Sequence, residues 1–354
     1  GDEFSIPFSI LSKRPFRPLN VPCHIVNTNT AVHSILKDNL NKSPMYSGKI
    51  DGAGPRYCPS IEDKVVRFSD RDRHSLFLEP EWVGSNQIYV NGFSTSMPKD
   101  IQEKALRQIN GFKSVVLIRP GYAIEYDYFP TYQLKNTLET KSIDGLYFAG
   151  QMNGTSGYEE AAAQGLIAGA NAARKLLNKN PLILNRNQAY IGVLIDDLIT
   201  KDIDEPYRMF TSRAEHRLYL RPDNCYSRLF SVAQDNGLLT ESQKNKTLQY
   251  LDALRCVLSF INKNKTTSNN KTISMKKYLR RPGVSFWSCP ESKKYDVKKF
   301  THLAVFEAET TIKYEGYIQN ELERIEKTSV LEGLKIPPSL TYSSINGLSN
   351  ESKE

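Results

Sequence analysis

The sequence lacks a long apolar run, a cysteine framework and a secretory leader. No apolar run approaches the ~20 residues that cross a bilayer. The 5 cysteines form an odd set without CxxC spacing or a cysteine–histidine cluster, which disfavours both disulfides and a metal site and favours a reducing compartment. The opening GDEFSIPFSIL has no basic segment before an apolar one, so it does not resemble a signal peptide.

The 354 residues suffice for two or three domains with a sizeable core. The net charge is +8, and its distribution is uneven. Residues 271–300 contain nine Lys or Arg and two acidic residues, a local excess of +7. One interpretation is a solvated surface; the other is a phosphate-contacting patch with aromatic side chains for stacking. The candidates for this patch are Lys276, Lys277, Arg280 and Arg281, with Tyr278, Phe286 and Trp287 between them.

Hydrophobic patterning predicts an α/β region followed by an all-α region. We expect a boundary near 176–186 and four parts: 1–50, 51–180, 181–335 and a tail, 336–354. Predicted strands cover 21–26, the 76–93 hairpin, a strand–turn–strand over 114–130, and 146–150. One predicted helix begins near Thr30 and is capped by Asn29 or Thr30, and a second covers 98–110. The chain is mostly helical from Arg186, and no strand is convincing after about residue 222.

A glycine-spaced turn joins the predicted strand 146–150 to an alanine-rich helix that starts between Thr155 and Tyr158. Glycine permits positive φ and close approach of a ligand, so this junction is a candidate cofactor mount. A close-packed structural helix is the alternative. The candidate residues are Gly150, Gln151, Asn153, Gly154, Gly157 and Glu159.

Two adjacent carboxylates, Glu159 and Glu160, lie in the predicted first turn of that helix. They suit the helix dipole and would repel a pyrophosphate placed on it. The junction is therefore predicted to face an uncharged part of a cofactor, such as a ribityl chain or a flavin ring.

The segment GPRYCPSIEDK contains Cys58 directly before Pro59, and Pro55 lies three residues upstream. Pro59 at a first helical position would make Cys58 the cap, whereas a start at Ser60 would pair with Asp63 in a capping box. The thiol is either reactive or structural. Cys23 and Cys256 are predicted to lie in the core.

Arginines follow one another in EPYRMFTSRAEHRLYLRPDN. A helix would place Arg213, Arg217 and Arg221 on one face, where they would bind phosphate or join the two domains. His216 is assigned to the same surface rather than to catalysis. Arg208 completes the set of RNA-binding candidates.

These segments together resemble the GidA/MnmG family. The similarity rests on ordered motifs spread over most of the chain, among them GPRYCPSIEDK, IYVNGFSTSMP, RPGYAIEYDY, GLYFAGQMNGTSGYEEAAAQGLIAGANAA, YIGVLIDDLITK and EPYRMFTSRAEHRLYLRPDN. The family consists of FAD-dependent enzymes that install a (carboxymethyl)aminomethyl group on carbon 5 of the wobble uridine of certain tRNAs. The motifs look bacterial, which implies a cytoplasmic location, or a mitochondrial one in a eukaryote.

The resemblance implies FAD, NADH and methylene-tetrahydrofolate as cofactors, the MnmE GTPase and tRNA as partners, and a homodimer. The implied fold is a partial FAD-binding Rossmann-like domain of the glutathione-reductase type with an inserted α/β segment, followed by a helical domain. Cys58 matches a catalytic cysteine of the family. The surrounding loop, 54–68, matches a nicotinamide-cofactor segment. Its candidate residues are Gly54, Pro55, Arg56, Tyr57, Glu62, Asp63 and Lys64.

The chain also departs from the family pattern. It has neither the GxGxxG that holds the FAD pyrophosphate nor a second cysteine in an early glycine loop, and the family continues past INGLSNE into a small helical domain. We therefore expect a piece of a longer enzyme that alone binds FAD poorly and is inactive. A generic flavin-dependent oxidoreductase and a non-catalytic tRNA-binding remnant are the alternatives.

Overall fold

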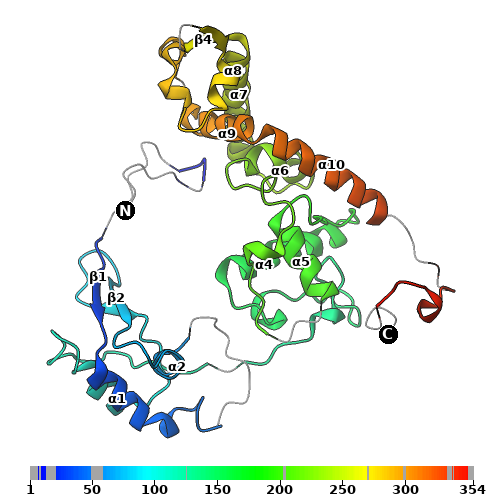
Figure 1. The fold of residues 1–354 in the computed structure, drawn as a ribbon. Coiled ribbons are helices and arrows are strands. Elements are labelled where there is room, and N and C mark those ends of the chain that lie inside the picture. The colour runs from blue at the N-terminus through cyan, green and yellow to red at the C-terminus, as the bar shows by residue number, and fades with distance from the viewer. Residues whose placement is uncertain are drawn as a thin grey trace. The chain divides into compact units, whose positions relative to one another are not determined.

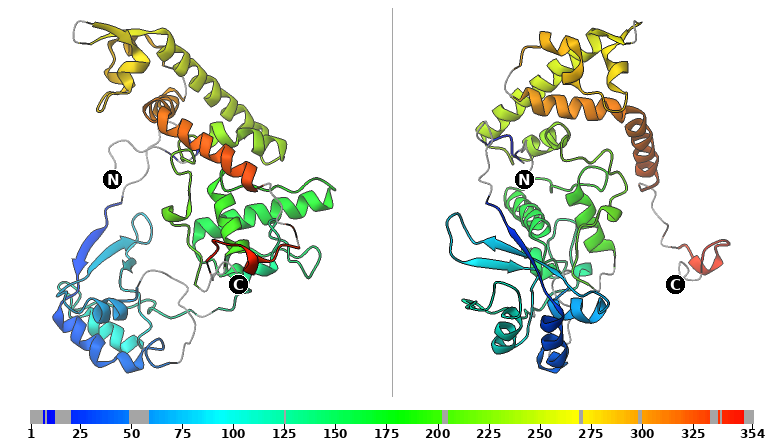
Figure 2. Two further views of the ribbon diagram at one scale, coloured as in Figure 1. Left: turned by 45° about the vertical axis from the view of Figure 1, so that its right-hand side comes forward. Right: turned by 60° about the vertical axis from the view of Figure 1, so that its left-hand side comes forward.

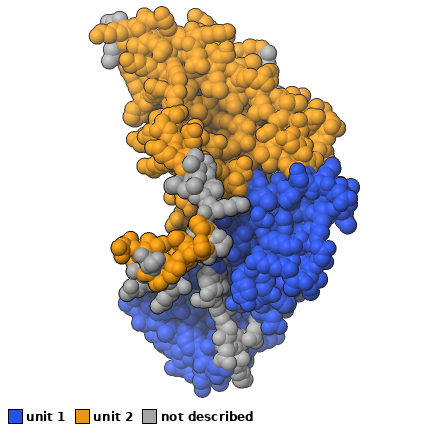
Figure 3. Space-filling view, turned by 90° about the vertical axis from the view of Figure 1, so that its right-hand side faces the viewer, with its two compact units in different colours: residues 1–184, 191–210 blue, residues 185–190, 211–354 orange. Residues whose placement is uncertain are grey.

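The computed structural model describes residues 7, 9–12, 21–48, 59–124, 126–201, 205–268, 271–297, 300–332, 337 and 339–349. The chain divides into two compact units, shown in blue and orange in Figure 3. Unit 1 comprises Gly1–Leu184 and Ile191–Phe210, and unit 2 comprises Asn185–Tyr190 and Thr211–Glu354. Among the described residues, none of the helices combines the length and apolar character needed to span a bilayer.

The first part of unit 1 is a small antiparallel sheet with three helices (Figure 1). The strands lie in the order β1-β2-β3, so β1 is an edge strand. Register pairs His24 with Leu78 and Phe77 with Asn91. The elements are β1 (His24–Asn27), α1 (Thr30–Asp38), α2 (Ile61–Arg67), β2 (Ser75–Pro80), β3 (Ile88–Asn91) and α3 (Lys99–Leu106).

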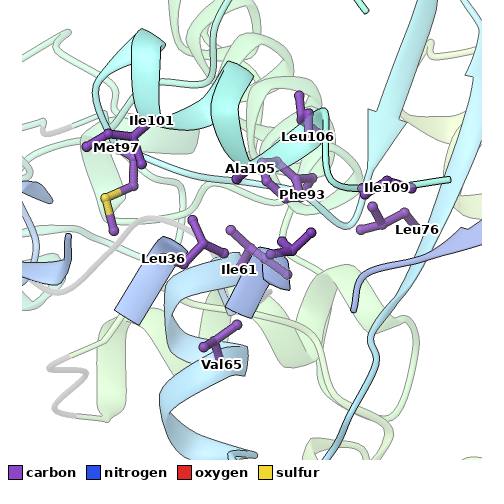
Figure 4. Packing of buried hydrophobic residues seen from close by; sticks show 11 residues of the cluster. Leu36, Ile61, Val65, Leu76, Phe93, Met97, Ile101, Ala105, Leu106 and Ile109 are labelled. Atoms are coloured by element: carbon purple, nitrogen blue, oxygen red, sulfur yellow. The ribbon is translucent and has the colours of Figure 1, made fainter. Parts of the chain in front are cut away.

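An apolar cluster holds this part together, as Figure 4 shows. Leu36 of α1, Ile61 of α2, Leu76 of β2 and Ala105 of α3 are each fully buried in it. Burying a Leu or Ile side chain stabilises a fold by about 1.5–3 kcal/mol, so this cluster fixes the three helices on the sheet. The predicted hairpin over 76–93 and the helix within 98–110 are confirmed.

Local capping sets where α1 and α2 begin. The side chain of Asn29 accepts a hydrogen bond from the backbone N–H of Val32 at 3.0 Å, as predicted for the start of α1. Ser60 and Asp63 form a capping box at the start of α2. Of the two predicted starts for α2, the Ser60 cap is confirmed and the Cys58 cap is wrong, because the helix begins at Ile61 and the Ser60 side chain accepts the N–H of Asp63.

The second part of unit 1 contains two helices and irregular chain. Helix α4 (Tyr158–Leu176) begins where predicted, and α5 (Tyr190–Thr200) follows. The strand predicted over 146–150 is not formed: an isolated bridge pairs Glu139 with Tyr147, and no strand among the described residues extends it. The strand–turn–strand predicted over 114–130 is also absent from the described residues of that range, because no neighbouring strand pairs with them.

Unit 2 is mainly helical, and α7 packs along α9 (Figures 1 and 2). Its helices are α6 (Cys225–Asp235), α7 (Glu241–Lys263), α8 (Met275–Leu279), α9 (Thr301–Lys313) and α10 (Glu315–Glu332). A polar group lies buried inside it: Glu307 accepts hydrogen bonds from the hydroxyls of Tyr250 and Ser227. Burial raises the pKa of both Glu307 and Tyr250.

Three expectations are wrong, two for unit 2 and one for Cys23 of unit 1. A hairpin follows residue 222, formed by β4 (Lys265–Ser268) and β5 (Lys271–Ser274). Its Lys, Ser and Thr composition hid the strand alternation that buries Thr266. Cys256 and Cys23 are exposed rather than in the core, because Cys256 lies on the outer face of α7 and Cys23 precedes an exposed edge strand.

Candidate functional site

The glycine junction is a turn of 3-10 helix, Gly150–Asn153, followed by α4. Gly150 and Gly154 have φ values of 68° and 67°, the left-handed conformation expected from their lack of a side chain. Gly157 does not share it, since its φ is −66°. A Cβ on Gly157 would lie 2.0 Å from Glu160 Oε2, so this glycine provides space for a carboxylate rather than a special backbone angle.

Gln164 of α4 organises the turn, and sequence reasoning missed it. Its Oε1 accepts hydrogen bonds from the Gly150 N–H at 2.8 Å and from Asn153 Nδ2 at 2.9 Å. Its Nε2 donates to Thr155 Oγ1 at 2.9 Å. The side chain is completely buried. The available signal was the helical spacing of Glu160, Gln164 and Asn171, which places three polar residues on the buried face of an alanine-rich helix.

The junction residues differ in what they offer a ligand. Gln151 and Glu159 are exposed. Asn153 is buried and its amide nitrogen donates to the Phe148 carbonyl, but its Oδ1 has no hydrogen-bond partner among the described residues. The N-terminal cap of α4 is Gly157, which provides no side-chain acceptor, so the first N–H groups of the helix lack a side-chain cap. Gly154 faces the ring of Tyr128, which would lie 3.3 Å from an added Cβ.

A segment from Tyr207 to Phe210 is fastened to this junction within unit 1. The Tyr207 N–H donates to the Gly154 carbonyl at 3.2 Å. The Met209 N–H donates to Glu160 Oε1 at 3.0 Å, and Arg208 Nε lies 3.3 Å from the same oxygen. The structure therefore brings one predicted RNA-binding residue, Arg208, next to the predicted cofactor turn.

The candidates for the nicotinamide cofactor divide into two groups. Those that precede α2, namely Gly54, Pro55, Arg56, Tyr57 and the catalytic candidate Cys58, lie outside the described residues. Those within α2 make local contacts. Buried Glu62 accepts from Thr95 Oγ1 at 2.7 Å, and Lys64 donates to the Gly92 carbonyl at 2.9 Å.

Asp63 completes the α2 cap and also accepts from the hydroxyl of Tyr46 at 3.1 Å. Burial, with the nearby Asp63 charge, raises the pKa of Tyr46 to about 12. Tyr46 therefore stays a neutral hydrogen-bond donor at physiological pH.

The arginine series does not form the predicted α-helix. Thr211–Arg213 is a short 3-10 turn, and irregular turns follow. The Arg213 carbonyl accepts from Arg186 at 2.9 Å, and this contact takes an acceptor that a helix would give to Arg217. Arg221 pairs with Asp223 at 3.0 Å, whereas exposed Arg217 has no partner among the described residues.

His216 lies in the same region of unit 2. Its Nδ1 is 2.9 Å from Glu321 Oε2. This contact ties the turns after residue 213 to α10 and supports the prediction that His216 belongs to a surface network.

The basic region of unit 2 has paired and unpaired cations. Lys276 of α8 and Arg280, the residue that caps the end of α8, both pair with Glu315 at the start of α10. Arg281 donates to Ser268 Oγ at 2.7 Å and lies over the Tyr278 ring at 5.4 Å. Within the described part of the chain, the ammonium group of Lys277 has no partner, so it is available to an anion.

One member of the predicted aromatic stacking set, Phe286, is wrong. Phe286 is fully buried between Phe260 and Tyr295, so it is a core residue and cannot stack on a base. Trp287 is 42% exposed and lies 5.0 Å from the His302 ring, centroid to centroid. Its exposed face is of the kind that stacks on nucleic-acid bases.

No group of three or more His, Cys, Asp or Glu side chains in the described ranges could hold a metal ion. A hollow of about 320 Å³ lies in unit 2, lined in part by Asp252, Cys256 and Asp296. Its two carboxylates would repel a phosphate, so it does not extend the basic region.

The fold and the junction together define a two-unit protein, with helices and a small sheet in the first unit and mainly helices in the second. The family model "Glucose inhibited division protein A" matches residues 1–180. This chain belongs to that family, and the resemblance expected from the motifs is confirmed.

Curated relatives match along the whole chain. An enzyme of Chlorobium phaeobacteroides named "tRNA uridine 5-carboxymethylaminomethyl modification enzyme MnmG" is 47% identical over 373 residues, covering 100% of this chain and 60% of its own length. A Flavobacterium psychrophilum enzyme of the same name is 48% identical and covers 94% and 56%. The chain thus spans about 60% of the length of the curated relatives it matches.

A solved structure shows the same fold. Aquifex aeolicus GidA, in its form I crystal, superposes with a TM-score of 0.83 at 42% identity, over 100% of this chain and 59% of the other. The form II crystal gives 0.77 over 94% and 53%. The order predicted from sequence, α/β first and helical afterwards, agrees with this match at the level of architecture.

Proposed function

We propose that this chain forms part of an enzyme that installs a (carboxymethyl)aminomethyl group on carbon 5 of the wobble uridine of tRNA. The observation that carries this proposal is the family membership, together with relatives of that name that are 46–48% identical along 94–100% of the chain. The proposed partners are tRNA, the MnmE GTPase and a second copy of the chain, and the proposed location is the cytoplasm.

The proposed cofactors are FAD, NADH and methylene-tetrahydrofolate, with FAD held at the glycine junction of a partial Rossmann-like domain. The residues fit an uncharged part of a flavin. Gly150 and Gly154 have left-handed backbone angles and carry no side chain that could obstruct a ligand. Among the described residues, the buried Oδ1 of Asn153 has no hydrogen-bond partner and could accept a hydrogen bond from the flavin. Acidic residues in the first turn of α4 disfavour a phosphate there. Bound FAD would supply the electrons of the reduction.

We propose that the junction residues predicted above bind FAD, including Gln151 and Glu159, whose side chains are exposed. Cys58 is proposed as the catalytic thiol, and the segment 54–68 as the site of the nicotinamide cofactor. In its described part, Glu62, Asp63 and Lys64 are positioned by contacts with Thr95, Ser60 and Gly92.

The proposed RNA-binding residues are the predicted cations. Among these candidates, Arg217 and Lys277 have no side-chain partner in the described part of the chain, and exposed Trp287 offers a stacking surface. Lys276, Arg280 and Arg281 would add positive charge although they also make protein contacts.

Three experiments test the proposal. Binding of a tRNA transcript, measured over a salt series, should weaken steeply with salt because cations replace counterions on the RNA. A shallow salt dependence would favour a flavin oxidoreductase that acts on a small molecule.

Nucleoside analysis of tRNA from cells that carry Cys58→Ser should show loss of the modified uridine. Cys256→Ser, which changes an exposed thiol of α7, is the matched control. Salt-dependent binding with unchanged modification would identify a non-catalytic tRNA-binding protein. Fluorescence titration with FAD should show weak binding by the 354-residue chain, and tight stoichiometric binding would contradict that expectation.

A further inference from the structure

Glu160 and Glu159 are neighbours in sequence but have different surroundings. Glu159 is exposed, whereas Glu160 is 7% exposed and lies at the third position of α4. A carboxylate at this position folds back toward the cap residue, and here its Oε2 occupies the space above Gly157. An exposed acid and a buried acid at one helix start cannot have the same role.

The buried carboxylate holds a segment that is distant in sequence. Its Oε1 accepts the Met209 N–H at 3.0 Å and lies 3.3 Å from Arg208 Nε. Tyr207, fully buried, adds two contacts: its N–H donates to the Gly154 carbonyl and its hydroxyl donates to Asp197 Oδ2 at 3.1 Å. Three successive residues of 207–209 are therefore tied to the junction.

The ion pair with Glu160 engages only the Nε side of the Arg208 guanidinium group. Arg208 is 41% exposed in its side chain, and its two terminal amino groups have no partner within the described part of the chain. A guanidinium held at Nε and free at both terminal nitrogens presents paired donors, which is the geometry that grips a phosphate.

We propose that Glu160 is a positioning residue that fastens 207–210 to the glycine junction and so holds Arg208 against a backbone phosphate of the RNA. The assignment of the anion as an RNA phosphate rests on the proposed function. The role of Glu160 in holding residues 207–209 at the junction does not. Gly157 is needed for the same arrangement, because any side chain at this position would displace the Glu160 carboxylate.

The test compares Glu160→Gln with Glu159→Gln. Both substitutions remove one negative charge, so simple electrostatics predicts tighter binding of a polyanion by each variant. Positioning predicts the opposite for Glu160→Gln alone. With a fluorescent tRNA transcript, we expect Glu160→Gln to weaken binding roughly 3-fold to 10-fold and Glu159→Gln not to weaken it. Arg208→Ala should lower the salt slope by about one.

A second readout does not depend on RNA. Trypsin cleaves after Arg208, and mass spectrometry follows that bond. Glu160→Gln should accelerate cleavage at 208–209 by about tenfold, because the segment opens more often when its charged contacts are lost. Gly157→Ala should do the same, and Glu159→Gln should not.

Two results would overturn the proposal. One is equal tRNA affinities for the two glutamine variants, and the other is wild-type cleavage at 208–209 in Glu160→Gln. A wild-type chain that fails to bind tRNA would contradict the proposed function, and the cleavage comparison would still decide whether Glu160 fastens the segment.

Discussion

Replacing Gln164 by leucine should open the glycine junction without leaving a cavity. Leucine nearly matches glutamine in size, so packing in α4 is kept while three hydrogen bonds are lost. Each such bond contributes about 0.5–1.5 kcal/mol net, and the Gly150 N–H left unpaired adds a desolvation cost of about 1–3 kcal/mol. Allowing for the apolar area that leucine buries, we expect the junction to open more easily by about 3 kcal/mol.

Hydrogen exchange at Gly150 measures this opening directly. Because about 1.4 kcal/mol corresponds to a factor of ten in an equilibrium constant, the amide should exchange roughly 100-fold faster in Gln164→Leu than in wild type. Mass spectrometry of a peptide that spans 148–157 provides the rate. Local exchange is the suitable assay, since a chain of two units need not unfold in one step.

Asn171→Leu is the matched control on the same helix. Asn171 is also a buried amide with several hydrogen bonds, but its partners are Leu182 and Thr137 rather than the turn. Its replacement should destabilise α4 to a similar degree and leave exchange at Gly150 nearly unchanged. Exchange at Gly150 within about threefold of wild type in Gln164→Leu would refute the role assigned to that side chain.

Three further predictions concern backbone strain and pH. Gly150→Ala should cost about 1–2 kcal/mol in thermal or urea unfolding, because φ is 68° and the added Cβ would lie 3.3 Å from Ala161 Cβ. Gly165→Ala, in open space on α4, should instead stabilise by about 0.5–1 kcal/mol, and equal effects of the two variants would contradict this account. Burial lowers the pKa of both His33 and His74, so unit 1 should lose stability as pH falls from about 6.5 through those lowered values, and His74→Gln should reduce the loss seen in melting curves. Burial raises the pKa of Glu307, so the stability that its protonated form contributes to unit 2 is present at acid pH and is lost as pH rises through the raised pKa. Glu307→Gln should therefore make the melting temperature less dependent on pH between about pH 4 and 7. An unchanged pH dependence of the melting temperature would be inconsistent with burial of this carboxyl group.

Features set by neighbouring residues could be predicted from the sequence. The caps at Asn29 and Ser60, the 76–93 hairpin and the start of α4 follow from contacts between residues a few positions apart. Positive φ at Gly150 and Gly154 is equally local. The motifs also sufficed to identify the family.

Features set by distant partners could not be predicted in the same way. Strand patterns at 114–130 and 146–150 did not become strands, because strand formation needs a paired neighbour as well as a favourable pattern. The arginine spacing suggested a helix, but Arg186 takes the Arg213 carbonyl. Phe286 looked like a stacking residue and is buried in unit 2.

The family, the left-handed glycines and the two acids at the start of α4 can be read from the sequence, because they depend on residue type and short spacing. Only the folded chain shows that Glu160 is the buried acid and that Arg208 lies at the junction. Those facts come from a hydrogen bond between residues 49 positions apart, and no local pattern encodes such a contact.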